Sequence, residues 1–110
     1  RQKSVKLCEI FISLVESKCE GFGFTLASPR DSEGRGSQVS FAHEDGYAIM
    51  QALIADQVIG DFRAPNLLRF GFTPLYTSYS DVWYAVERLV SIMENKKYDK
   101  PEFKVKAAVT

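Results

Sequence analysis

The residue best suited to bind a ligand is Arg69, the one charged side chain in the otherwise apolar segment 67–76. This segment predicts a strand that runs into a turn. Burying a guanidinium without a partner costs on the order of several kcal/mol, so we expect Arg69 to have an anionic partner. No Asp or Glu lies between Asp61 and Asp81. A planar guanidinium suits a carboxylate held by two parallel hydrogen bonds, which leaves two sources open: a distant part of the chain, or a ligand.

Asp61 and Arg63 are two residues apart in an extended segment, so their side chains lie on the same face. We expect both to take part in a structural ion pair, either with each other or with the polar loop at residues 29–36. Arg63 also borders the same turn as Arg69, which makes it a second candidate for an anion contact. The candidate ligand-binding residues are therefore Arg69 and Arg63.

The remaining reactive side chains form no recognisable site. His43 is the only histidine, and we expect it to lie near the start of a helix, exposed to solvent. The alternative for His43 is a lone acid–base group. A single histidine does not make a zinc site without cysteines or a carboxylate cluster, and no Ser or Thr has a base at a recognisable spacing. We therefore predict no metal-binding residue and no nucleophile.

The segment Gly21-Phe22-Gly23-Phe24 matches the centre of an octamer that stacks RNA bases on strand aromatics. That octamer has a basic residue where Glu20 stands and an aromatic residue where Ala27 stands. We interpret the segment instead as a helix stop followed by a strand with core-facing phenylalanines.

The composition indicates one small domain with a single core. The chain has 110 residues, 45% hydrophobic and 25% charged, with 14 basic and 14 acidic residues. A neutral chain without a long apolar run predicts neither a nucleic-acid partner nor a membrane. Cys8 and Cys19 are expected to be small core residues of a reduced, cytoplasmic protein. The first residue is Arg1, already inside a helical pattern, so we expect a piece of a longer protein.

Hydrophobic periodicity predicts an α+β two-layer sandwich of order α-β-β-α-β-β-α, with a mostly antiparallel sheet and helices on one face. Helices are expected at 3–18, from Glu44-Asp45-Gly46 onward, and after the capping box Ser78-x-x-Asp81. The second helix should bury Tyr47, Met50, Leu53 and Ile54. Strands are expected at 22–27, 37–41, 58–62 and 67–72, with Arg63-Ala64-Pro65-Asn66 as the turn between the last two. We assign residues 1–95 to one domain and 96–110 to a loose charged tail.

Three segments together resemble the C-terminal small domain of kynureninase. They are residues 36–43, residues 46–54 and residues 58–76. The specific part is Asp61-Phe62-Arg63-Ala64-Pro65 followed by Leu68-Arg69-Phe70-Gly71-Phe72-Thr73-Pro74-Leu75-Tyr76. The resemblance covers residues 21–89, most of the chain.

The resemblance implies a homodimeric, cytoplasmic enzyme of the fold type I class that uses pyridoxal 5'-phosphate. Such enzymes hydrolyse the Cβ–Cγ bond of L-kynurenine, or of 3-hydroxykynurenine, to anthranilate (or its 3-hydroxy derivative) and L-alanine. In that family the arginine matching Arg69 binds the substrate α-carboxylate, while the cofactor forms an imine with a lysine of the large domain. The bound carboxylate would fix the rotation about Cα, so that the bond to be broken aligns with the cofactor.

The large domain of that family is absent from this chain. All lysines here lie on the first helix or in the tail, and none occupies an apolar pocket suited to imine chemistry. We therefore predict no catalytic and no cofactor-binding residue in this fragment, and no turnover by the fragment alone. Two alternatives stay open: the small domain of another class V enzyme, such as a desulfurase or aminotransferase, and a stand-alone regulatory module that binds amino acids.

Overall fold

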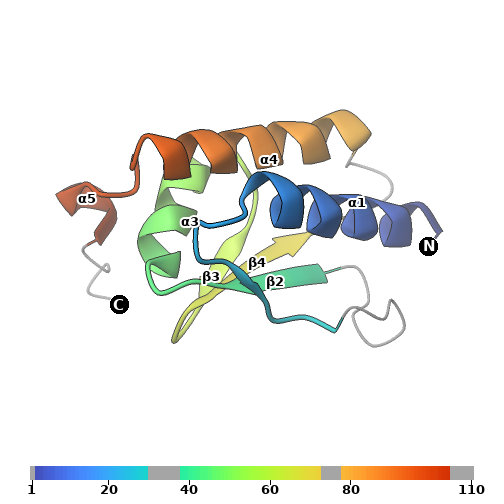
Figure 1. The fold of residues 1–110 in the computed structure, drawn as a ribbon, viewed down its shortest axis with the longest axis horizontal. Coiled ribbons are helices and arrows are strands. Elements are labelled where there is room, and N and C mark those ends of the chain that lie inside the picture. Colours follow the sequence, from blue (N-terminus) through green and yellow to red (C-terminus); the bar gives the residue numbers. More distant parts are fainter. Residues whose placement is uncertain (1, 30–37, 73–77, 105–110) are drawn as a thin grey trace.

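The computed structural model describes residues 2–29, 38–72 and 78–104 (Figure 1). The helices are α1 (Gln2–Lys18), α3 (Gly46–Ala55), α4 (Tyr79–Glu94) and α5 (Pro101–Lys104). The strands are β1 (Thr25–Leu26), β2 (Gln38–Ala42), β3 (Asp61–Arg63) and β4 (Leu67–Gly71). This is the predicted α+β class, and the predicted order α-β-β-α-β-β-α is confirmed as far as α4. The expected loop at 30–36 and the segment Thr73–Tyr76 lie outside the described residues.

The strands form one antiparallel sheet of order β1-β2-β4-β3. Helices α1 and α4 lie side by side over one face of this sheet, and α3 packs beside β3 and β4 (Figure 1). No described element covers the opposite face, which we call the open face. A layered arrangement of this kind buries the apolar side of the sheet and leaves the other side available to a ligand or to another domain.

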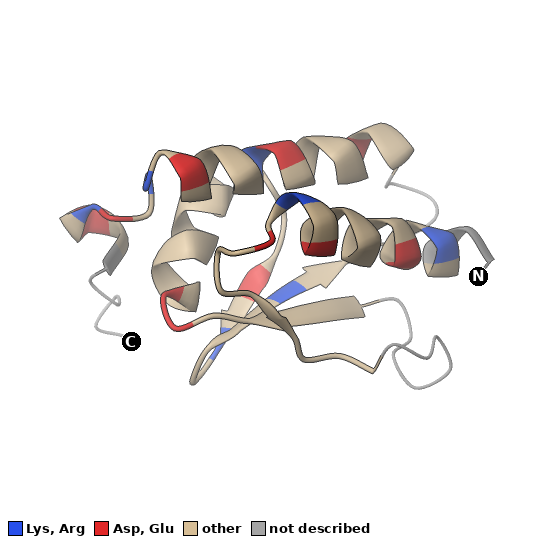
Figure 2. Ribbon diagram, viewed as in Figure 1, with Lys and Arg blue, Asp and Glu red and all other residues tan. Residues whose placement is uncertain are grey.

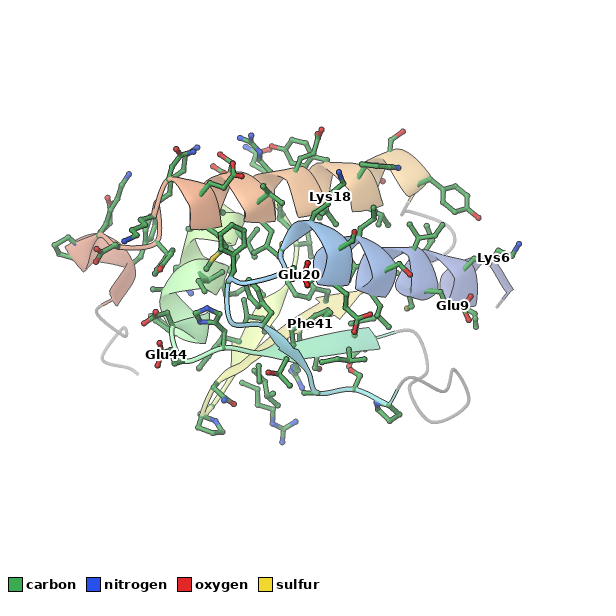
Figure 3. The ribbon with its side chains drawn as sticks, viewed as in Figure 1. Lys6, Glu9, Lys18, Glu20, Phe41 and Glu44 are labelled. Carbon is green, nitrogen blue, oxygen red and sulfur yellow. The ribbon has the colours of Figure 1, made fainter. Side chains whose placement is uncertain are left out.

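The core is built around Phe11 of α1. Its ring lies 4.7 Å from that of Phe70, 5.2 Å from that of Phe72 and 6.1 Å from that of Phe41, measured between centroids. Phe41 projects from β2 toward the helices (Figure 3). Aromatic rings at these separations combine a large buried area with favourable ring–ring geometry, so α1 is held firmly on β2 and β4.

Buried and partly or fully exposed residues alternate along β4, in keeping with this packing. Leu68 and Phe70 are buried in the core, while Leu67, Arg69 and Gly71 are not. Because successive side chains of a strand point to opposite faces, Arg69 must lie on the open face. A shift of one residue in register would bring Arg69 into the core, which is why the register is strongly specified here.

Several predicted boundaries need correction. The strand expected at 22–27 begins only at Thr25, because Gly21 and Gly23 adopt positive φ angles of 88° and 95° and form a turn. The strand expected at 58–62 begins at Asp61. In α3 the side chain of Tyr47 is only partly buried and Ile54 is 45% exposed, contrary to expectation. The buried residues of this helix are Gly46, Ala48, Ile49, Met50, Ala52 and Leu53.

The predicted capping box at the start of α4 is confirmed. The Ser78 side chain accepts a hydrogen bond from the Asp81 backbone N–H, and the Asp81 carboxylate accepts one from the Ser78 backbone N–H. These bonds satisfy donors that the first turn of a helix leaves unpaired. They also hold the pKa of Asp81 below its ordinary value, the backbone bond being the larger cause.

The predicted tail is not loose over the part that the structure describes. Tyr98 and Phe103 pack against the core, and α5 contacts α3. The assignment of residues 1–95 and 96–110 to a domain and a tail stays a prediction. Among the described helices, none is long and apolar enough to cross a membrane.

Gly60 permits the close approach of β3 to β4. A Cβ added there would lie 2.8 Å from the Arg69 carbonyl oxygen and 3.0 Å from Met50 Cε. Because one of these neighbours is backbone, the strands would have to move apart. We predict that Gly60→Ala lowers the free energy of unfolding by about 1–3 kcal/mol, measured by urea denaturation.

Gly71→Ala is the matched control, because an added Cβ at Gly71 meets no atom of a described residue within 4 Å. The control variant should stay within about 0.5 kcal/mol of the original chain. Equal losses in the two variants would contradict the close-approach explanation.

Candidate ligand-binding site on the open face

Arg69 forms a two-bond ion pair with Asp61. Arg69 Nε donates to Asp61 Oδ1 at 2.7 Å, and Arg69 Nη2 donates to Asp61 Oδ2 at 2.9 Å. Both distances are in the range of strong charge-assisted hydrogen bonds, and the parallel pair fixes the orientation of the guanidinium plane. Figure 2 shows that the charged residues of the sheet are confined to β3 and β4.

The pairing is a direct result of strand register. The turn at residues 64–66 places Arg63 opposite Leu67, Phe62 opposite Leu68 and Asp61 opposite Arg69. Phe62 is also part of the packed side, so its neighbours in β3 face the open side. Directly opposite residues on one face of an antiparallel pair have Cβ atoms about 5 Å apart, which suits a carboxylate and a guanidinium.

Two expectations about Arg69 are corrected by this geometry. Its side chain is not buried, since 29% of it is exposed. Its partner is not distant either, because Asp61 lies eight residues earlier and directly across the hairpin. The length of the turn is the sequence signal that identifies this partner, because it sets which residues of β3 and β4 face each other.

Arg63 and Asp61 do not form the predicted ion pair with each other, because Asp61 is bound to Arg69. Arg63 is exposed at the end of β3, on the same face as Asp61, and no described residue forms a salt bridge with it. Its charge is close enough to contribute to lowering the pKa of Asp61. Arg63 therefore adds positive potential beside Arg69.

The pair holds both partners in their charged forms. The hydrogen bond from Arg69 is the largest cause that lowers the pKa of the Asp61 carboxyl, followed among the lowering causes by the charges of Arg69 and Arg63. The same hydrogen bond raises the pKa of Arg69. Asp61 thus remains a carboxylate to a lower pH than an ordinary aspartate does.

Asp61 uses only one edge of the guanidinium. Arginine has five N–H protons, and the contacts to Asp61 take the one on Nε and one on Nη2. The second edge, formed by Nη1 and the other Nη2 proton, donates no hydrogen bond to any described residue. This second edge has the geometry to bind another carboxylate through two parallel hydrogen bonds.

His43 has a structural role and is not exposed, which corrects the expectation. Its side chain is buried, with only 6% of the residue accessible. Asp45 N–H donates to His43 Nδ1 at 2.9 Å, so the proton is on Nε2, which donates to the Phe22 carbonyl at 2.7 Å. His43 thereby joins the turn before β1 to the start of α3.

The two cysteines are buried and unbridged, as expected for core residues. Burial raises the pKa of the Cys19 thiol to about 11, with a smaller contribution from Glu94. Cys19 therefore remains protonated at neutral pH and is a poor nucleophile. Among the residues with described positions, no group of three or more potential metal ligands occurs.

A sequence profile described as the kynureninase C-terminal domain matches residues 1–89. The chain belongs to the kynureninase C-terminal domain family. Kynureninases of Burkholderia mallei (strain SAVP1) and Burkholderia pseudomallei (strain K96243) are each 54% identical to it over 110 residues, and that of Pseudomonas fluorescens is 49% identical. These alignments cover 100% of this chain and 26% of each relative, so the chain spans about a quarter of their length.

The described lysines of this kynureninase C-terminal domain do not fit a site for pyridoxal phosphate. An imine-forming lysine lies in a desolvated pocket, whereas Lys6 and Lys18 lie on the exposed side of α1 (Figure 3). Lys18 Nζ is 5.4 Å from the centre of the exposed Trp83 ring. Lys96, Lys97 and Lys100 follow α4 and are exposed or partly exposed.

We predict that the Asp61–Arg69 pair makes a pH-dependent contribution to stability. The pKa of Asp61 is lower in the folded than in the unfolded chain, so the contribution is present above about pH 4 and is lost as the pH falls through the folded pKa. In Arg69→Gln, an NMR titration of the Asp61 carboxyl carbon should give a pKa close to the ordinary value.

Arg63→Gln is the control for that titration, because it removes a nearby charge and leaves both hydrogen bonds in place. It should raise the pKa of Asp61 by less than Arg69→Gln does. An equal or larger rise in the control would show that the paired hydrogen bonds are not the main cause.

We predict that His43→Ala lowers the free energy of unfolding by about 2–4 kcal/mol, because it removes two buried hydrogen bonds and leaves a cavity. Denaturant titration measures the loss. The neighbouring exposed residue supplies the control, and Glu44→Ala should change stability by less than about 0.5 kcal/mol. A His43 variant as stable as the control would be inconsistent with the bridging role.

Proposed function

We propose that this chain is the substrate-binding small domain of a kynureninase, and that Arg69 binds the α-carboxylate of L-kynurenine. The observation that carries the proposal is the second edge of the Arg69 guanidinium, which is oriented by Asp61 and lies on the open face, where no described element covers the sheet. Membership of the kynureninase family supports this substrate over those of desulfurases or aminotransferases, and over a stand-alone regulatory module.

The proposed role of Arg69 is to hold the substrate α-carboxylate and to orient the substrate. Two parallel hydrogen bonds to a carboxylate restrict rotation about Cα more than a single contact does. Arg63 contributes positive charge on the same face and would assist the approach of the anion. The reaction consumes one water: the carbonyl carbon of the side chain becomes the carboxylate of anthranilate, and Cβ gains a proton to give L-alanine.

The longer protein would bind pyridoxal 5'-phosphate through residues outside this chain, since the described lysines do not fit that group. The cofactor is the electron sink of such a reaction. We further propose a cytoplasmic homodimer for the full-length enzyme. This fragment alone is expected to be inactive.

We predict that Arg69→Lys in the intact protein lowers kcat/KM for L-kynurenine by roughly 100-fold, because an ammonium cannot reproduce the planar two-bond contact. Steady-state hydrolysis, followed by the formation of anthranilate, measures this loss. Arg63→Lys is the control, and its effect should be far smaller.

The competing role for Arg69 is a purely structural ion pair with Asp61. A thermal unfolding curve of each variant separates the two roles, because the ligand role predicts a nearly unchanged Tm. Full activity per folded molecule in Arg69→Lys would contradict the proposed function.

A further inference from the structure

We infer that Asp61 is a positioning residue for the carboxylate-binding arginine. It acts by holding the guanidinium so that the edge formed by Nη1 and Nη2 remains directed to the ligand. The inference rests on the proposed function of Arg69. It adds a specific role for a residue of β3 that does not itself touch the substrate.

The first argument is the division of donors. Asp61 takes the protons on Nε and one side of Nη2, which are the two that point to the same side of the guanidinium. A ligand carboxylate can therefore bind to the other edge without displacing Asp61. An aspartate bound to the Nη1 and Nη2 edge would instead compete with the ligand for the same protons.

The second argument is rigidity. An arginine side chain has several rotatable bonds and loses much conformational freedom when it is held in one orientation. Asp61 is short, and its backbone is fixed directly opposite Arg69 by the β3–β4 pairing. The ordering of the guanidinium is thus completed before the ligand arrives, which favours ligand binding.

The third argument is the support behind Asp61. The preceding residue, Gly60, lies so close to the Arg69 carbonyl that a Cβ would be only 2.8 Å away. Met50 of α3 is also close, since its Cε would lie 3.0 Å from the same Cβ. The start of β3 is therefore packed against both β4 and α3, which fixes the backbone that carries the Asp61 carboxylate.

The charge of Asp61 opposes ligand binding, and the geometry limits that opposition. The two carboxylates would lie on different edges of the guanidinium, with the cation between them. Asp61 is 59% exposed, so water screens its field. Arg63 on the same face offsets part of the same negative charge. The orienting effect should therefore exceed the repulsion.

The test is Asp61→Asn in the intact protein. Asparagine keeps the shape, but it accepts only one of the two hydrogen bonds and opposes the other donor with its own N–H. We expect the inhibition constant of a non-reacting kynurenine analogue that retains the α-carboxylate to rise about tenfold. The constant of the decarboxylated analogue should not change.

A double-mutant comparison shows whether Asp61 acts through Arg69. In an Arg69→Lys background, Asp61→Asn should weaken binding of the carboxylate analogue by less than about twofold, because the guanidinium that Asp61 orients is then absent. Glu87→Gln, which removes an exposed acid on α4, controls for the change of net charge and should have no effect.

The outcomes separate the two proposals. Equal weakening of both analogues by Asp61→Asn, losses that add in the double variant, or tighter binding of the carboxylate analogue would each overturn the positioning role. If Arg69→Lys does not discriminate between the analogues, the proposed function of Arg69 itself fails. If Arg69→Lys discriminates and Asp61→Asn does not, only the positioning role fails.

Discussion

The burial of Leu68 and Phe70 is the constraint on which the site depends. Both residues of β4 lie in the core, and Phe11 of α1 packs on Phe70 with ring centroids 4.7 Å apart. The residue between them has to point away from the helices. A cation that the core could not accommodate is thereby placed on a face that no described element covers, where it can meet an anion. The aromatic core and the position of Arg69 on the open face are thus consequences of one strand alternation.

The ion pair with Asp61 changes how Arg69 is understood. From the sequence, a salt bridge and a ligand contact are competing explanations of the same charge. In the structure they are compatible, because Asp61 uses Nε and Nη2 and leaves the other edge of the guanidinium for a ligand. We propose that the two-bond geometry of this partly exposed pair serves to orient the guanidinium.

The sequence predicts the types of the elements up to α4 because the longer helices and strands have a clear hydrophobic period, whereas the four-residue α5 lies in the segment predicted to be a tail. It also predicts the cap at Ser78, because the two hydrogen bonds of a capping box join residues only three apart, here Ser78 and Asp81. The partner of Arg69 does not follow from the sequence prediction, because a turn at residues 63–66 places Gly60, and not Asp61, opposite Arg69. In the structure the turn spans 64–66, and this difference changes which residue of β3 faces Arg69.

The burial of His43 is not predictable from the sequence for a different reason. Its acceptor bond with Asp45 is local, but its donor bond goes to the Phe22 carbonyl, 21 residues away. No periodicity reports a contact of that range. Gly23 leaves room for this contact, since a Cβ there would lie 3.3 Å from His43 Nε2. The positive φ of Gly23 also belongs to the turn that delays the start of β1 to Thr25. The burial of His43 thus depends on a tertiary contact that local sequence patterns do not predict.

The most direct test of the account is a crystal structure of the intact protein with a non-reacting kynurenine analogue that retains its α-carboxylate. The account predicts that the two carboxylate oxygens lie about 2.9 Å from Arg69 Nη1 and Nη2, while Asp61 still binds Nε and Nη2. A carboxylate bound elsewhere, with Arg69 contacting Asp61 alone, would contradict it.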